Sequence, residues 1–261
     1  MPNRTEYKHG TFSWVDLGTT DSAAAKKFYG ALFGWTFDDM PAGPGMTYTM
    51  CKLNGQDAAA LYTMDKSMQG VPPHWASYIA VDDVDAIAKK VTSAGGKVVK
   101  EPFDVLDAGR MVVVEDPTGA IVSFWQGKKH IGAGIVNEPG SLTWNELFTN
   151  NVDRAGKFYV QTVGWKTESV DMGPMGTYTL FKRAGEDGNA GGMMNIPPNM
   201  QGVPPHWLAY FAVADCDASA KKAGELGGKV AVPPTDIPNI GRFAIVQDPQ
   251  GATFALFKMG H

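Results

Sequence analysis

The chain repeats itself over almost its whole length. The residues QGVPPHW occupy positions 69–75 and occur again, unchanged, 132 residues later. Nearer the start the offset is 130, as between Trp14 and Trp144, and DPTGA at 116–120 returns as DPQGA at 248–252. This period is far longer than that of a solenoid repeat, so each copy is predicted to fold as a domain of its own.

The domain boundaries follow from the repeat. We expect one domain over residues 9–128 and a second over residues 140–259. The residues between them, 129–139, are rich in glycine and show no hydrophobic periodicity, which is typical of a linker.

The composition narrows the classes of function. With 44% hydrophobic and 19% charged residues, the 261-residue chain has the make-up of a soluble globular protein. Its formal net charge of −4 gives no electrostatic reason to expect nucleic acid or an anionic membrane as a partner. The polar first residues predict no secretory signal, and no segment is apolar enough to span a bilayer. Two cysteines without metal-type spacing fit a reducing compartment, so we expect a cytoplasmic protein.

Hydrophobic periodicity predicts the elements of each copy. Residues 12–18 alternate as in a strand, and apolar residues within 25–33 recur at helical spacing. Asp21 suits the N-cap of this helix, and Gly34 suits the left-handed residue at its end. Two apolar stretches then follow on either side of Asn54-Gly55, which is a hairpin signal.

The same order starts again at Trp75. A strand over 75–81 precedes a helical face between Val84 and Val91, and further strands are expected up to residue 126. Each half-domain therefore reads as a strand, a helix and three strands, and the chain contains four such units. The predicted fold class is α+β.

These features resemble the vicinal oxygen chelate superfamily, which includes glyoxalase I, extradiol dioxygenases and bleomycin resistance proteins. The resemblance rests on Phe28-Tyr29, the LFGW exit at 32–35, the VDDVD junction at 81–85 and the DPTG turn at 116–119. The chain is most similar to the tandem, glyoxalase-like proteins of actinobacteria, often labelled hydroxylases, which include a mycobacterial culture-filtrate antigen. The resemblance implies that two βαβββ units pair in each domain to form a curved sheet around a ligand-binding cup.

The resemblance also implies a divalent metal, which the family holds with side chains from the first, fourth, fifth and eighth strands. At the matching positions of the first copy stand Trp14, Ala76 and Ser123, and residues 58–60 of the fourth strand offer no carboxylate. The second copy is equally bare, with Trp144, Leu208, Ala255 and Gly191-Gly192. Because indole, methyl and isobutyl groups cannot replace imidazole or carboxylate as ligands, we predict no metal and no other cofactor in either cup.

Strand alternation predicts which side chains line the cups. Each cup is expected to be aromatic, with one carboxylate and one histidine. The predicted ligand-binding residues are Trp14, Asp16, His74, Tyr78, Ser123 and Trp125 in the first copy, and Trp144, Glu146, His206, Tyr210 and Phe257 in the second. In this interpretation the repeated QGVPPHW places a histidine and a tryptophan, Trp75 or Trp207, beside each cup.

Each of these residues also has a purely structural interpretation. The tryptophans would fill a core that otherwise holds a metal site. His74 and His206 follow Pro-Pro pairs, and each would satisfy a backbone carbonyl at a strand entrance. Asp16 and Glu146 need a partner if they are buried, because an unpaired buried charge is costly. The candidate partners are the histidine of the same cup, Arg110 and Arg242.

Two functions remain open from the sequence. The first is a metal-free protein that binds a small aromatic or amphipathic metabolite or antibiotic. The second is a glyoxalase-like lyase or hydroxylase, with or without an unusual metal site, whose candidate catalytic residues are Asp16, His74, Glu146 and His206. A third interpretation rests on resemblance to the antigen alone: a protein that is exported without a signal and recognised by a host. We expect a monomer whose two domains imitate the dimers of the family, or a homodimer.

Overall fold

The computed structural model describes residues 4–43, 45–173, 176–185, 188–200 and 202–260. The first domain contains β1 (Thr11–Thr19), α1 (Ser22–Phe33), β2 (Thr36–Gly43), β3 (Met46–Leu53), β4 (Gln56–Thr63), β5 (His74–Ala80), α2 (Val84–Ser93), β6 (Lys97–Val105), β7 (Gly109–Glu115) and β8 (Ile121–Gly127). The second contains β9 (Leu142–Thr149), α3 (Val152–Val163), β10 (Lys166–Asp171), β11 (Thr177–Lys182), β12 (Asn189–Asn195), β13 (His206–Ala212), α4 (Cys216–Glu225), β14 (Lys229–Ile237), β15 (Gly241–Gln247) and β16 (Thr253–Met259).

Each domain forms one eight-stranded sheet. The strand order is β2-β3-β4-β1-β5-β8-β7-β6 in the first domain and β10-β11-β12-β9-β13-β16-β15-β14 in the second. Since β1 runs antiparallel to β5 but parallel to β4, and β5 runs parallel to β8, the two βαβββ units of a domain meet along β1 and β5. The predicted α+β class with four such units is confirmed. Apolar alternation does not locate β2, because this edge strand is exposed along most of its length.

Local signals act as the sequence predicts. The side chain of Asp21 caps α1 by accepting a 2.9 Å hydrogen bond from the backbone N–H of Ala24. Gly34 ends the helix with φ of 75°, in the left-handed region that glycine enters without strain. The hairpin between β3 and β4 turns at Asn54 and Gly55, whose φ values are 52° and 77°.

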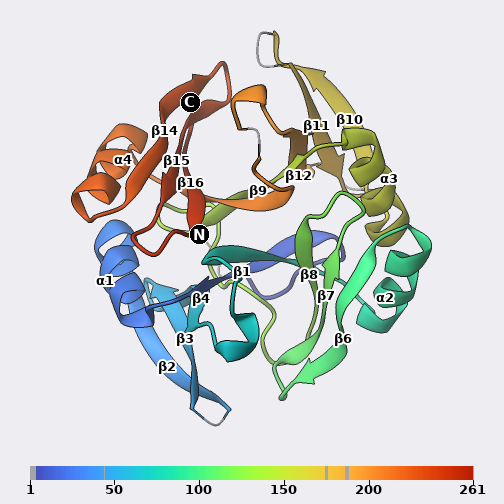
Figure 1. Ribbon diagram of the computed structural model, residues 1–261, viewed down its shortest axis with the longest axis horizontal. Helices are drawn as coiled ribbons and strands as arrows, with labels where there is room; N and C mark the ends of the chain where they lie inside the picture. The colour runs from blue at the N-terminus through green and yellow to red at the C-terminus, as the bar shows by residue number, and fades with distance from the viewer. Residues whose placement is uncertain (1–3, 44, 174–175, 186–187, 201, 261) are drawn as a thin grey trace.

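The two sheets lie back to back and share their cores. Figure 1 shows the sheets meeting in the middle of the molecule, with α1 beside α4 at one side and α2 beside α3 at the other. One hydrophobic core joins Phe28 and Tyr29 of α1 with Phe211 and Phe254 of the second domain. The other core joins the α2 half of the first domain with the α3 half of the second. The first unit of the chain therefore packs on the fourth, and the second on the third.

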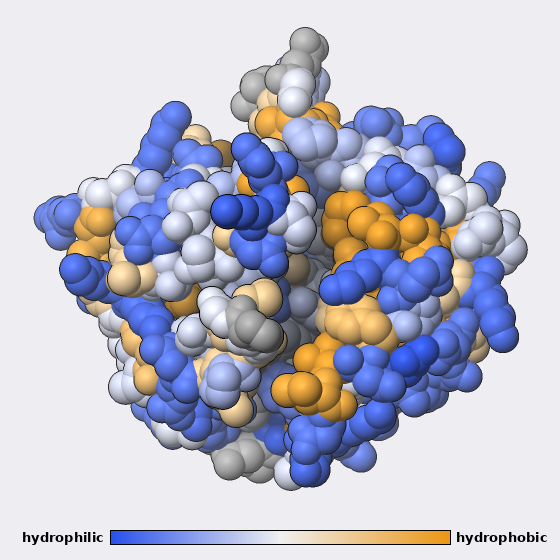
Figure 2. All heavy atoms as spheres, turned by 60° about the horizontal axis from the view of Figure 1, so that its bottom comes forward, coloured by the Kyte–Doolittle hydropathy of each residue, from blue (hydrophilic) through white to orange (hydrophobic). Residues whose placement is uncertain are grey.

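Each sheet curls away from this shared centre, so the two inner faces open toward opposite sides of the molecule. Figure 2 looks onto the side where the first sheet opens and shows a hollow in the middle of this face, with hydrophobic side chains along one edge. Within the described residues no helix has both the length and the apolar character that crossing a membrane requires.

Candidate functional site

The inner face of the first sheet carries the residues that strand alternation selected. Trp14 and Asp16 project to this face from β1, whereas Val15 and Leu17 between them pack into the shared core. Neighbouring strands add His74, Ala76 and Tyr78 from β5, and Ser123 and Trp125 from β8. The six predicted ligand-binding residues of the first domain thus lie on adjacent strands.

Two tyrosines hold the carboxylate of Asp16. The hydroxyls of Tyr48 and Tyr78 donate to its Oδ2 at 2.9 and 2.8 Å, and Nε1 of Trp14 donates to the Tyr48 hydroxyl at 2.9 Å. The second oxygen, Oδ1, has no hydrogen-bond partner among the described residues, although Asp16 is only 3% exposed. A buried acceptor without a partner costs about 1–3 kcal/mol, so Oδ1 is well suited to accept a hydrogen bond from a bound molecule.

The same burial tunes the acidity of the carboxyl group. Desolvation raises the pKa of Asp16 to about 6, and the bonds from Tyr78 and Tyr48 and the charge of His74 oppose this rise. A carboxyl with such a pKa exchanges its proton close to neutral pH, where general acid–base catalysis is efficient. Burial raises the pKa of Tyr48 and of Tyr78 well above the usual range, so both remain protonated hydrogen-bond donors.

The second domain repeats this network around a longer carboxylate. Tyr210 donates to Oε2 of Glu146, and Nε1 of Trp144 donates to the hydroxyl of Tyr178 at 3.0 Å. The Tyr178 hydroxyl also hydrogen-bonds Glu146. Burial raises the pKa of Glu146, as it does that of Asp16. Phe257 and Ala255 of β16 complete this face, at the places of Trp125 and Ser123.

The residue opposite the buried acid on the adjacent strand differs between the domains, as does the length of the acidic side chain. Asp16 lies opposite Ala60, whereas Glu146 lies opposite Gly192. The hydroxyl of Tyr178 lies only 2.0 Å from the position that a Cβ at residue 192 would take. The longer glutamate therefore occurs where the neighbouring strand leaves room for the displaced tyrosine.

Sequence reasoning missed the tyrosines of the third strand. Tyr48 and Tyr178 belong to the dipeptides Thr47-Tyr48 and Thr177-Tyr178, which repeat at the same offset of 130 residues as Trp14 and Trp144. Their role depends on the pairing of β3 with β4, and of β4 with β1, which places Tyr48 beside Asp16. A repeated polar aromatic residue is thus the signal that could have found them.

The two histidines use one ring nitrogen for the backbone. Nδ1 of His74 lies 2.9 Å from the carbonyl oxygen of Pro72, and Nδ1 of His206 lies 2.9 Å from that of Pro204. The structural interpretation therefore accounts for Nδ1 of both rings. The His206 ring also stacks on Phe148, with centroids 5.3 Å apart. Only Nε2 of each ring is left for a ligand.

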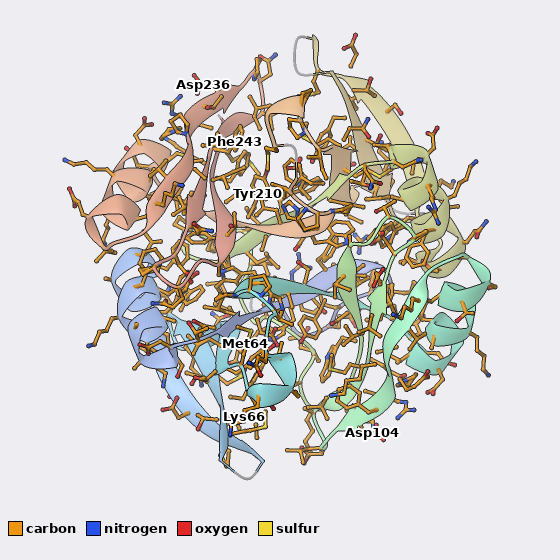
Figure 3. The ribbon with its side chains drawn as sticks, viewed as in Figure 1. Met64, Lys66, Asp104, Tyr210, Asp236 and Phe243 are labelled. Atoms are coloured by element: carbon orange, nitrogen blue, oxygen red, sulfur yellow. The ribbon has the colours of Figure 1, made fainter. Side chains whose placement is uncertain are left out.

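Two expectations about partners are wrong. Arg110 pairs with Asp85 and Asp104, and Arg242 pairs with Asp217 and Asp236, so neither arginine neutralises the buried carboxylates. Figure 3 shows Asp104 and Asp236 at the outer rims of the sheets, while Tyr210 and Phe243 lie inside the second curl. Ion pairs with nearby aspartates hold both arginines at the rims. The buried carboxylates of Asp16 and Glu146 instead accept hydrogen bonds from neutral tyrosine hydroxyls.

The tryptophans of QGVPPHW are also not beside the cups. Trp75 and Trp207 belong to the cores shared by the domains, where their Nε1 atoms donate to the hydroxyls of Tyr29 and Tyr159 at 3.0 and 2.8 Å. Since adjacent residues of a strand point to opposite faces, the inward position of His74 sends Trp75 to the back of the sheet.

The linker packs against the first domain, which the sequence did not predict. The backbone N–H of Ala133 donates to the carbonyl of Ser13 at 2.8 Å, and the His130 ring lies edge-on to Trp14, with centroids 4.6 Å apart. Nε1 of Trp125 donates to the His130 carbonyl at 2.9 Å. The linker thus covers the Trp14 end of the inner face and leaves the Ala76 side uncovered.

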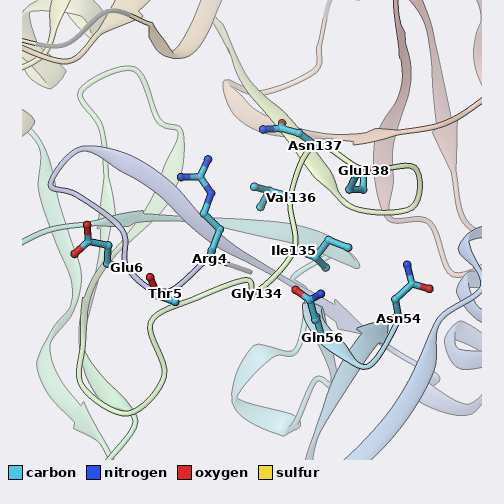
Figure 4. Close-up of a pocket in the computed structure, with 10 residues that line it drawn as sticks. All are labelled: Arg4, Thr5, Glu6, Asn54, Gln56, Gly134, Ile135, Val136, Asn137 and Glu138. Carbon is cyan, nitrogen blue, oxygen red and sulfur yellow. The ribbon is translucent and has the colours of Figure 1, made fainter. Parts of the chain in front are cut away.

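A separate cavity of about 650 Å³ lies where the N-terminal segment, the β3–β4 turn and the linker meet (Figure 4). Its polar lining includes Arg4, Glu6, Asn54 and Glu138. None of the predicted site residues contributes to it. It is therefore distinct from the inner faces.

The inner faces do not present the family's set of metal donors. The matching positions hold Trp14, Ala76 and Ser123 in the first domain, and the nearby Asp16 is already engaged by two phenols. Across the described residues no group of three or more histidine, cysteine, aspartate or glutamate side chains converges as for a metal ion. Whether the protein carries a metal stays a prediction.

The duplicated sheets with inward-facing aromatic and carboxylate groups define a tandem protein of the vicinal oxygen chelate class. The family model of the Glyoxalase/Bleomycin resistance protein/Dioxygenase superfamily matches residues 11–124 and 140–256, so the chain belongs to this superfamily.

Two relatives that match nearly the whole chain come from Mycobacterium and Streptomyces. The chain is 52% identical over 260 residues to "Putative glyoxylase CFP32" of Mycobacterium tuberculosis, covering 99% of this chain and 98% of that one. It is 37% identical over 271 residues to the "Anthracycline biosynthesis protein DnrV" of Streptomyces peucetius, covering 98% and 95%.

Solved structures share the fold at low identity. A Mn(II)-bound glyoxalase from Novosphingobium aromaticivorans superposes with a TM-score of 0.65 at 17% identity, covering 96% of this chain and 82% of that one. The 2,2',3-trihydroxybiphenyl 1,2-dioxygenase of Sphingomonas wittichii has a TM-score of 0.66 at 14% identity, covering 97% and 92%.

Proposed function

We propose that the protein binds a small, flat aromatic molecule on the aromatic inner faces of its sheets, without the divalent metal typical of its superfamily. One observation carries this proposal. In the first domain a buried carboxylate is fixed through Oδ2 by two tyrosines, while Oδ1 is left without a partner among the described residues. An aromatic setting with a few fixed polar groups is the usual pattern of small-molecule recognition.

Similarity supports the chemical class of the ligand. The relative from Streptomyces peucetius is named for anthracycline biosynthesis, and anthracyclines are polycyclic aromatic molecules. The phenol rings of Tyr48 and Tyr78, both partly exposed, offer stacking partners, worth roughly 0.5–1.5 kcal/mol per pair beyond the area that is buried. Flat polycyclic aromatic molecules therefore suit this face better than small aliphatic ones.

A thermal-shift screen tests the proposal. Hydroxyanthraquinones are expected to raise the melting temperature, because a ligand at about 100 times its Kd stabilises the native state by roughly 2.7 kcal/mol. Intrinsic fluorescence should fall as the ligand approaches Trp14. Turnover of methylglyoxal–thiol adducts by protein with one metal per domain, and no response to any aromatic compound, would refute the proposal.

The pKa of Asp16 favours a second function, an enzyme that moves a proton on the same class of molecule. With a pKa raised to about 6 by burial, ionised Asp16 would accept a proton from a carbon or oxygen acid at Oδ1 and return it to the product. Incubation of candidate substrates with the protein in D2O tests this reading. Solvent deuterium should enter the substrate with wild-type protein and not with the Asp16→Asn variant, whereas binding without exchange supports a pure binding protein.

A further inference from the structure

We infer that only the first domain accepts the ligand, that the ligand is a planar aromatic molecule whose phenolic hydroxyl donates to Oδ1 of Asp16, and that the second domain fills its own inner face. This inference rests on the proposed function and narrows it to one site and one class of ligand. It follows from comparing the two copies position by position.

The first difference lies directly beside the carboxylates. Asp16 has Ala76 opposite it on β5, whereas Glu146 has Leu208 opposite it on β13. Ala76 is partly exposed, but Leu208 is buried in a cluster of inward-facing side chains. A ligand can therefore approach Asp16 past a methyl group, while an isobutyl group covers the same approach to Glu146.

The second difference lies two residues after the carboxylate, on the same face of β1 and β9. The position of Gly18 in the first domain is held by Phe148 in the second. Phe148 is buried, stacks on His206 and packs with Leu208, Tyr210 and Ile245. A fixed aromatic ring thus takes up the middle of the second inner face.

Over Gly18 the three nearest atoms all belong to side chains and none to the backbone. A Cβ on Gly18 would lie 3.1 Å from the Tyr62 hydroxyl, 3.2 Å from Cγ of Met64 and 3.3 Å from Cε1 of His74. The Tyr62 hydroxyl has a weak, 3.9 Å contact with the sulfur of Met68. Figure 3 shows Met64 on the side where the first sheet opens. Methionine adapts its shape easily, so Met64 can make way for a ligand.

The free oxygen of Asp16 selects a hydrogen-bond donor. The groups that act on this carboxylate are Tyr78, Tyr48 and His74, and no lysine or arginine is among them. Both tyrosine hydroxyls are spent on Oδ2. A phenolic hydroxyl on the ligand would satisfy Oδ1 while its ring lies against the aromatic wall, and hydrogen bonds to ionised groups are among the stronger ones.

Isothermal titration calorimetry with 2,6-dihydroxyanthraquinone, whose hydroxyls are too far from the quinone carbonyls to bond to them, and with unsubstituted anthraquinone tests the inference on the full chain. The hydroxylated compound is expected to bind wild-type protein at one site per chain. Ala76→Leu copies the second domain into the first and should weaken binding at least tenfold. The matched variant Leu208→Ala should leave the affinity and the stoichiometry unchanged. Circular dichroism confirms that each variant is folded.

The Asp16→Asn variant provides an independent arm that keeps the shape of the site. It should weaken binding of the dihydroxy compound at least tenfold and leave the weaker binding of anthraquinone unchanged. Two sites per chain, a loss of affinity in Leu208→Ala rather than in Ala76→Leu, or equal affinities for the two probes would overturn the inference while leaving the proposed function intact. No binding of any aromatic probe would instead refute the proposed function itself.

Discussion

The hydroxyl of Tyr29 in the first domain donates a 2.9 Å hydrogen bond to Oδ2 of Asp248 in the second. The reciprocal bond joins the Tyr159 hydroxyl to Oδ2 of Asp116 at 3.1 Å. Both aspartates use Oδ1 to accept backbone N–H groups of their own DP-x-G turns. Each turn is thereby fixed to a helix of the other domain, so the duplicated motifs bind the two copies together.

Removing either tyrosine hydroxyl should destabilise the whole chain. Tyr29→Phe leaves Oδ2 of buried Asp248 without its donor, and Tyr159→Phe does the same to Asp116, at a cost of about 1–3 kcal/mol each. Urea unfolding followed by circular dichroism measures this loss. Tyr62→Phe is the control, because its hydroxyl makes only a weak contact with sulfur at 3.9 Å, and it should change stability by less. Equal effects of all three variants would contradict a stabilising role of the Tyr29–Asp248 and Tyr159–Asp116 hydrogen bonds between the domains.

Asp16 should make the protein less stable as the pH rises. Its folded pKa of about 6 lies above the ordinary value of 3.8, so protonation favours the folded state. The contribution is complete below about pH 4 and is lost as the pH rises through 6, on the order of 2–3 kcal/mol. Unfolding free energies measured from pH 4 to 7 should show this decline in wild-type protein and a smaller decline in Asp16→Asn, where Glu146, whose pKa burial also raises, still titrates.

Asp39 provides a control of opposite sign. The bond from Lys26 lowers the pKa of this exposed carboxyl, so its contribution is present above its unfolded pKa and is lost as the pH falls. Asp39→Asn should therefore leave the decline between pH 4 and 6 in place. A flat profile in the wild-type protein would show that Asp16 is not desolvated in the way the structure indicates.

The shorter Asp16 lies opposite Ala60 and the longer Glu146 lies opposite Gly192. A double substitution in the second domain tests whether the two positions depend on each other. Gly192→Ala forces a Cβ against the Tyr178 hydroxyl and disrupts its bonds to Trp144 and Glu146, which should cost roughly 1–3 kcal/mol. Adding Glu146→Asp restores the combination found at Asp16 and Ala60, so the double variant should be more stable than the sum of the two single effects.

A second glycine serves as the control for this cycle. Gly224 lies in α4 and a Cβ there would meet nothing within 4 Å, so Gly224→Ala should stabilise the protein by about 0.5–1 kcal/mol. Strict additivity of Gly192→Ala and Glu146→Asp in chemical denaturation would show that the match is coincidental.

Removal of divalent metal should change neither stability nor ligand binding. The positions that would supply the donors carry Trp14, Ala76 and Ser123, so we expect chelation to extract no ion from them. Melting temperature and affinity for 2,6-dihydroxyanthraquinone are measured before and after dialysis against EDTA, together with elemental analysis. Stoichiometric zinc, manganese, nickel or iron, and a fall in melting temperature on chelation, would reverse this expectation.

Short-range patterns in the sequence were sufficient for most of the elements, for the duplication and for the faces of the first-strand residues, but not for the exposed strand β2 or for the side on which Trp75 and Trp207 lie. The N-cap at Asp21, the left-handed Gly34 and the Asn54-Gly55 hairpin are local choices of backbone conformation, which neighbouring residues decide. Alternation in the same way placed Trp14 and Asp16 on one face, because it depends only on the period of a strand.

Partners far apart in the sequence were decided by the tertiary structure alone. Tyr48 reaches Asp16 only through the pairing of β3 with β4 and β4 with β1, and Tyr29 meets Asp248 only because the first unit packs on the fourth. The sequence placed Asp16 on the inner face of its strand and Tyr29 on the buried face of its helix, but it identified neither Tyr48 nor Asp248 as a partner. The sequence by itself therefore determined on which face these two groups lie, because this depends only on the local period. Strand pairing and the packing of the two domains determined which groups satisfy one another and which, like Oδ1 of Asp16, lack a partner among the described residues.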